Sequence, residues 1–120
     1  PMGEPVRALV MTEKMYKEKR DVAERTMACF VEATSLFRKD PKLAEKYVRE
    51  NMFKGQITSQ DFRDALDNAE YTYDITIEHI DITTGLMQKY GVGRMAKPPK
   101  AADWVKLDLL QKAKATLKVK

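Results

Sequence analysis

Residues 6–11 read Val-Arg-Ala-Leu-Val-Met, a short apolar run between Pro5 and Thr12. An apolar run of this length is typical of a buried β-strand. A strand needs neighbours, because backbone N–H and C=O groups that are buried without partners are costly. Its partner is either a strand hidden later in the chain or a sheet outside these residues. The sequence favours the second, a sheet from an earlier part of a longer chain, or a strand exchanged between two copies as a homodimer.

The remainder of the chain is predicted to be helical. Asp40 followed by Pro41 is a typical helix start, because Asp caps the first turn and Pro lacks only an N–H that would be unpaired anyway. Thr58 and Asp61 have the spacing of a capping box. The alternating stretch Tyr71–Ile75 predicts an extended lead into the next helix. Together with apolar periodicity, these signals predict helices over about residues 13–19, 21–39, 41–51, 59–70, 77–90 and 108–117.

The helix predicted at 21–39 has a wide apolar face. Its apolar residues fall on two neighbouring stripes, Ala23, Met27, Phe30 and Phe37 on one and Val22, Cys29, Ala33 and Leu36 on the other. This width predicts a helix packed against more than one neighbour. Cys29 is accordingly predicted to be a small core residue and not a nucleophile. The expected fold class is mostly α, a single domain (1–120) of five to six helices with one short N-terminal strand.

The residue inventory argues against the common enzyme classes. The 120 residues contain one cysteine, which excludes an internal disulfide and every multi-cysteine metal or redox motif. The single histidine, His79, cannot form a His-rich zinc site alone and is predicted to be a partly exposed polar residue. No glycine spacing forms a phosphate-binding loop. We therefore predict no catalytic residue, no metal site and no cofactor, and we do not expect an enzyme.

Charge is distributed unevenly along the chain. Residues 89–120 carry nine basic and two acidic side chains, so this stretch is +7 and the rest is −3, within a net charge of +4. A basic tail could bind nucleic acid or an anionic surface. We favour lysines that solvate a terminal helix, because arginines and interleaved aromatic residues are nearly absent. No nucleic-acid partner is expected, and the acidic helix at 59–70 argues against a helix-turn-helix reader.

The order of the elements is similar to that of a known family. A strand ending in Thr12-Glu13 leads to a long helix, a restart at Asp40-Pro41 and an acid-rich helix. Tyr71-Thr72-Tyr73-Asp74 precedes a helix that ends in Tyr90-Gly91-Val92, and a Pro-containing loop, Ala102-Asp103-Trp104-Val105 and a closing helix follow. This arrangement resembles the carboxy-terminal part of solute-binding proteins of ABC importers, in the branch for nitrate, sulfonates, taurine and thiamine-precursor pyrimidines. The resemblance covers nearly the whole chain.

The resemblance implies a fold and a function. The fold would be the C-terminal portion of a periplasmic-binding-protein-like (type II) α/β fold, and the chain a piece of a longer, non-catalytic receptor. Such a receptor closes on a small, often anionic ligand and delivers it to an ABC permease, in the periplasm or tethered at the cell surface. Its cleft forms between two lobes, so no ligand-contacting residue is carried over to this piece. A sheet in the earlier part of the receptor would also pair with the strand at 6–11.

The alternative is a stand-alone helical module that binds another protein through an exposed apolar patch. Seven methionines support it, because Met-rich surfaces adapt to varied partners. We favour the interpretation that Met27, Met52 and Met87 fill core positions, since they stand at helical spacing. The receptor hypothesis and the module hypothesis differ in what covers the apolar surface, which is the rest of one receptor in the first case and a separate partner in the second.

Overall fold

A computed structural model describes residues 8–94 and 96–120 of the chain. Within these residues the protein is mostly helical, as the sequence predicts, and contains no β-strand. The α-helices are α1 (Glu13–Glu18), α2 (Arg20–Lys39), α3 (Pro41–Tyr47), α4 (Ser59–Asp67), α5 (Ile77–Lys89), α6 (Ala101–Trp104) and α7 (Asp108–Leu117). A π-helical turn, η1 (Val48–Met52), continues α3, and a short 3-10 turn, η2 (Val92–Arg94), follows α5.

The strand predicted at 6–11 is wrong over the part that the structure describes. Residues 8–11 lie outside any helix or strand, and Val10 is 80% exposed. Residues 6 and 7 lie outside the described residues. The stretch Tyr71–Ile75 belongs to no strand either, so the described chain offers no edge with which residues 8–11 could form a ladder. A single extended segment cannot satisfy its backbone groups in a sheet without such an edge.

The helix starts follow the local sequence signals. The Asp40 carboxylate accepts a hydrogen bond from the Leu43 N–H at 3.0 Å, and Pro41 opens α3. The capping box of α4 is formed in both directions, with the Asp61 N–H donating to Thr58 Oγ1 at 3.1 Å and the Thr58 N–H donating to Asp61 Oδ2 at 2.7 Å. These bonds satisfy N–H groups that a helix start leaves unpaired, which is why short motifs locate the starts well.

The helix ends differ more from the prediction. The helix expected over 41–51 changes to π-type hydrogen bonding at Val48, where the Phe53 N–H donates to the Val48 carbonyl at 3.1 Å. The helix expected to reach residue 70 ends at Asp67, because the Asn68 side chain donates to the Asp64 carbonyl at 2.6 Å and takes over one of the terminal acceptors. The four-residue helix α6 has no counterpart in the prediction.

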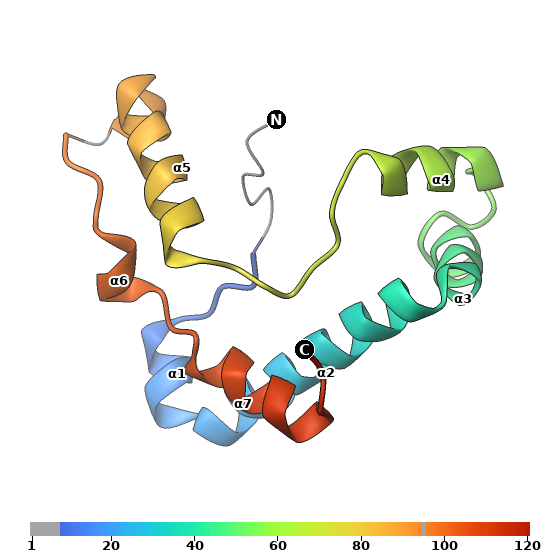
Figure 1. Cartoon of the computed structure of the whole chain (residues 1–120), viewed down its shortest axis with the longest axis horizontal. Coiled ribbons are helices and arrows are strands. Elements are labelled where there is room, and N and C mark those ends of the chain that lie inside the picture. The colour runs from blue at the N-terminus through green and yellow to red at the C-terminus, as the bar shows by residue number, and fades with distance from the viewer. Residues whose placement is uncertain (1–7, 95) are drawn as a thin grey trace.

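The core is a thin layer between α2 and α7. Val31 of α2 is fully buried against Leu110 and Ala113 of α7, and Tyr73 completes the cluster. The Tyr73 hydroxyl donates to the Lys120 carbonyl at 2.7 Å, so the segment between α4 and α5 is attached to the C-terminal end of the chain. Figure 1 shows α2 and α7 side by side, with the chain after α2 leading away from this pair.

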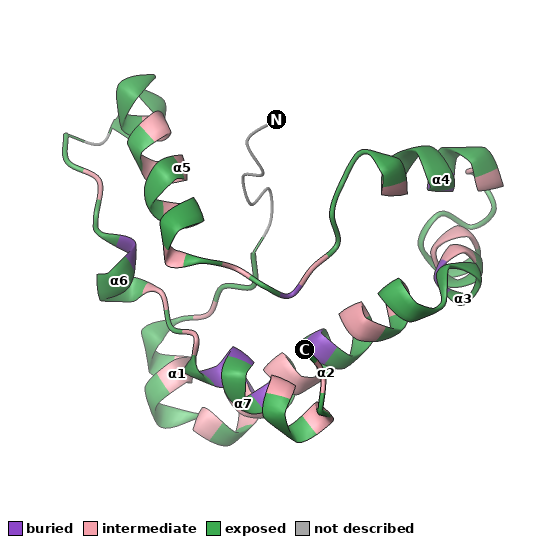
Figure 2. Cartoon of the chain, in the orientation of Figure 1, coloured by how far each residue is buried: buried purple, intermediate pink, exposed green. Residues whose placement is uncertain are grey.

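The molecule is open. Its radius of gyration is 16.8 Å, compared with about 14 Å for a compact domain of this length. It exposes 9453 Å², about 2,800 Å² more than a compact protein of this mass. Residues 1–7 could account for no more than about 1,100 Å² of that surplus. In Figure 1, α3 and α4 form one arm and α5 and α6 form another, and in Figure 2 the exposed colour dominates both arms.

Candidate interaction surface

Helix α2 is covered on one side only. Ala23 and Val31 are completely buried, and Met27 between them is partly buried against the same cluster. Residues spaced four apart lie on one face of an α-helix, so these three mark the side of α2 that contacts α7. Ala23 and Met27 belong to the first stripe that the sequence predicts as core, and Val31 belongs to neither predicted stripe.

The opposite side of α2 is exposed and apolar. At 3.6 residues per turn, Cys29, Ala33 and Leu36 lie on the side away from Met27 and Val31. Cys29 and Ala33 are exposed, Leu36 is 52% exposed, and the neighbouring Phe30 is 37% exposed. We call these four residues, Cys29, Phe30, Ala33 and Leu36, the open face of α2. The exposed Arg25 and Glu32 lie on the same side of α2, beside these four apolar residues.

Aromatic packing closes the C-terminal end of the open face. Phe37 is half-buried because its ring lies 5.0 Å from the Tyr71 ring and 6.1 Å from the ring of Phe62, centroid to centroid. Phe62, in turn, is 5% exposed. The segment after α4 therefore returns to the end of α2 and leaves the open face uncovered before it. Helix α3 continues with two more exposed apolar side chains, Leu43 and Tyr47.

Three predictions of burial are wrong. Cys29 is exposed and not a core residue, because α2 has two apolar stripes but only one helix, α7, packed along it. Met52 is 65% exposed, since the π-helical turn that contains it has no buried residue. The large indole of Trp104, followed by Val105, predicts an anchor on the body of the protein, but Trp104 is 46% exposed. Met27 is partly buried against the core cluster, in agreement with the prediction, whereas Met87 is partly buried on α5, which has no buried residue.

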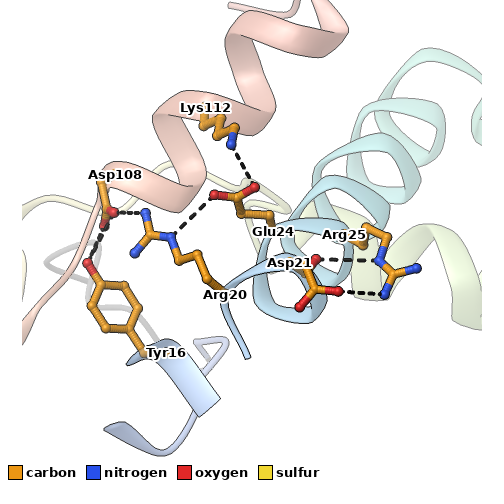
Figure 3. A network of polar contacts seen from close by, with 7 residues as sticks. All are labelled: Tyr16, Arg20, Asp21, Glu24, Arg25, Asp108 and Lys112. Carbon is orange, nitrogen blue, oxygen red and sulfur yellow. Dashed lines mark hydrogen bonds and ion pairs between the residues drawn. The ribbon is translucent and has the colours of Figure 1, made fainter. Parts of the chain in front are cut away.

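A polar network fixes α7 on the covered side of α2 (Figure 3). The Asp108 carboxylate accepts hydrogen bonds from the Tyr16 hydroxyl, at 3.0 Å and 3.1 Å to its two oxygens, and from the Arg20 guanidinium. Arg20 also pairs with Glu24 at 3.3 Å, and Lys112 Nζ lies 2.6 Å from the second Glu24 oxygen. We call these five residues the α7 clasp. The clasp joins α1 and α2 to α7 at the side of the apolar core.

The electrostatics of the clasp favour its charged form. Burial raises the pKa of Asp108, but the hydrogen bonds from Arg20 and Tyr16 together outweigh it, so the pKa lies below its ordinary value. The Lys112 ammonium, and with it Arg20, lowers the pKa of the Glu24 carboxyl. The Arg20 pKa is raised, chiefly by Asp108. All three side chains are therefore ionised near neutral pH, and the clasp keeps α7 on its own side of α2.

The other candidate residues form no assembled polar site. His79 is exposed in the first turn of α5, where its backbone N–H donates to Thr76 Oγ1 at 3.2 Å. In the part of the chain that the structure describes, no three potential metal ligands lie together and no polar residue is buried. A shallow hollow of about 340 Å³ lies along α3 and η1 and includes Arg49. That guanidinium is already bonded to Glu45 at 3.2 Å and Ser59 at 2.9 Å, which gives it a structural role.

In comparisons with known proteins, no protein-family model, no curated protein and no solved structure is significantly similar to this chain. Among residues 8–94 and 96–120, no helix combines the length and apolar character needed to cross a bilayer. The open face of α2 is therefore the strongest candidate for a binding surface. The sequence places Cys29, Ala33 and Leu36 on one predicted stripe and Phe30 on the other, but it could not show that these residues are uncovered.

Proposed function

We propose that this chain is the carboxy-terminal part of the solute-binding component of an ABC importer. The imported solute would be small and anionic, such as a sulfonate, nitrate or taurine, or a pyrimidine precursor. The observation that carries the proposal is the open face of α2. A helix with apolar residues on both sides is suited to lie between two layers, and among the described residues α7 covers one of these sides along most of α2. The missing layer is the sheet of a type II binding-protein fold.

The surplus of exposed surface supports this proposal. Helices that cover the faces of a largely parallel sheet bury one side on that sheet, and each loses its partner if the sheet is taken away. The surplus left after residues 1–7 are discounted is about 1,700 Å², the size of a complete protein–protein interface. Helix α5 supports it too, since it is rich in isoleucine and contains no buried residue.

The element order is the second support. The helix starts at residues 13, 20, 41, 59, 77 and 108 agree with the order on which the resemblance rests, although residues 8–11 form no strand. In the proposed role the partners are the solute and the ABC permease, and the protein acts in the periplasm or tethered at the cell surface. The solute would bind between this part and the remainder of the receptor, without catalysis.

Cys29 provides a direct test, because it is the sole cysteine of the chain and lies on the open face. The rate of its reaction with a maleimide is measured in the 120-residue chain and in the full protein encoded by the same reading frame. We expect the free chain to react as an exposed thiol does, and the full protein to react at least about tenfold more slowly. We also expect calorimetry to detect binding of a small organic or inorganic anion by the full protein.

A matched control uses the Cys29→Ala/Lys42→Cys variant, which moves the thiol to an exposed position of α3. This thiol should react at nearly the same rate in both proteins. Equal reactivity of Cys29 in both proteins would refute the covered face. A reading frame that begins immediately before Pro1 would refute the receptor, and the stand-alone module would then be the better account of the same surface.

A further inference from the structure

The structure divides the basic residues of the C-terminal quarter into two groups. In α7, Lys112 pairs with Glu24 at 2.6 Å and Lys114 pairs with Asp74 at 2.6 Å. These lysines attach α7 to α2 and to the segment before α5. The basic residues between positions 89 and 100 are used differently. Lys89 ends α5 and Arg94 lies in the 3-10 turn η2, whereas Lys97 and Lys100 lie outside any helix.

The second group lies on an arm made of α5, η2 and the returning loop. The Gln88 side chain donates to the Ala96 carbonyl at 2.7 Å, and the Ala101 N–H donates to Asp81 Oδ1 at 2.7 Å. The loop therefore runs back along α5 from its C-terminal end. Figure 1 shows this arm standing away from α2 and α7, with the end of α5 at the periphery of the molecule.

The outer part of the arm, residues 82–102, has one sign of charge. Between Ile82 and Ala102 the sequence contains no acidic residue. It contains four cations, which are all exposed: Lys89, Arg94, Lys97 and Lys100. Among the described residues none of the four forms an ion pair with a carboxylate. Two strongly exposed apolar side chains accompany them, Tyr90 at 70% and Val92 at 52%. We call these six residues the basic tip.

The backbone makes the basic tip narrow. Gly91 and Gly93 have φ angles of 70° and 73°, and Arg94 follows with 51°. Three residues with positive φ so close together reverse the direction of the chain within a few residues. Glycine adopts this left-handed conformation without strain. The Lys89 ammonium lies 5.5 Å from the centre of the Tyr90 ring, so cation and aromatic ring share one side of the tip.

We propose that the basic tip docks on the surface of a bilayer that contains anionic phospholipid. The cations would contact the phosphate groups, and Tyr90 and Val92 would enter the headgroup region, where amphipathic and apolar side chains are favoured next to basic ones. This surface is separate from the open face of α2, and the proposal does not depend on the receptor function.

Charge complementarity favours a flat anionic surface over a nucleic acid. The four cations of the tip equal the whole net charge of +4, so the rest of the chain is neutral overall, and the acidic helix α4 lies toward the opposite end of the 44 Å long molecule from α5 (Figure 1). Because charges are screened over about 8 Å at physiological salt, the tip acts on a bilayer independently of α4. A nucleic acid would gain little from the exposed valine, whereas a headgroup layer accepts it.

Vesicle co-sedimentation tests the proposal with the full chain. We expect binding to vesicles in which about a third of the lipid is phosphatidylglycerol, no binding to pure phosphatidylcholine, and release by high salt. Each cation near such a surface contributes about fivefold in affinity, so Lys97→Gln/Lys100→Gln should weaken binding about 25-fold. Tyr90→Ala should weaken it further without changing the salt dependence.

The matched control is Lys42→Gln/Lys46→Gln, which removes the same charge from exposed positions of α3 and should change binding less than twofold. Equal loss in the two double variants would overturn the proposal, because it would indicate attraction by net charge alone. Equal binding to both kinds of vesicle would overturn it as well. Displacement of the vesicles by a low concentration of a DNA or RNA oligonucleotide would assign the tip to nucleic acid instead. The wild-type salt and lipid series decides the question even if a variant fails to fold.

Discussion

The same truncation at two leucines distinguishes the covered side of the α2–α7 pair from its open side. Leu110 of α7 is 8% exposed and belongs to the core cluster, whereas Leu36 on the open face is 52% exposed. Leu→Ala at a buried site costs about 2–5 kcal/mol of unfolding free energy. Because the thin α2–α7 layer can collapse onto the cavity left by the leucine, we expect Leu110→Ala to cost about 2–3 kcal/mol. Full burial of a leucine is worth about 1.5–3 kcal/mol, and half of Leu36 is already in water.

Leu36→Ala should therefore cost about 1 kcal/mol or less in the isolated chain, with part of that loss recovered by the higher helix propensity of alanine. Urea unfolding followed by circular dichroism at the helical band measures both variants. Their free energies should differ by at least about 1 kcal/mol, and the m-values should remain equal. A loss at Leu36 as large as the loss at Leu110, independent of protein concentration, would mean that the open face is covered within the chain and would refute the reasoning.

The remaining predictions concern the clasp and the cap of α4. Because the pKa values of Glu24 and Asp108 are lowered in the folded protein, the folded state binds fewer protons. The stabilisation is complete above the ordinary Glu value of 4.5 and is lost as the pH falls through the lowered values, so amide exchange in α7 should accelerate there. Lys112→Met should weaken this acid dependence. If amide exchange in α7 depended on pH in the same way in this variant, the role of the Lys112–Glu24 pair would be refuted. Thr58→Ala removes the cap of α4 and should cost about 1 kcal/mol of local stability, seen as faster amide exchange confined to α4.

Local signals were sufficient for the starts of α3 and α4. The cap at Asp40 and the capping box at Thr58 each require only residues within three positions, so the sequence contains the whole interaction. The ends were less predictable because other contacts set them. Asn68 ends α4 through its own side chain, and in the π-helical turn after α3 the Arg49 guanidinium donates to the Ile57 carbonyl at 3.1 Å. Neither contact leaves a periodic pattern in the sequence.

The strand at 6–11 was predicted from composition and failed over residues 8–11 for a different reason. Apolar residues such as Leu9 and Val10 favour a strand only if an edge is available, and the described residues provide none. The same dependence on a partner explains Cys29. A stripe of apolar residues indicates that this face of a helix is buried, but the stripe does not identify the element that covers it.

The two errors point in one direction. Residues 8–11 lack a sheet, and the open face of α2 lacks a layer on the side away from α7. Covering the open face with another described helix of this chain would require α5 or α6 to move across the molecule, because both stand away from α2 (Figure 1). Either a sheet from elsewhere in a receptor or a separate protein partner would cover the open face. The reactivity of Cys29 in the full protein is the measurement in which the two accounts differ.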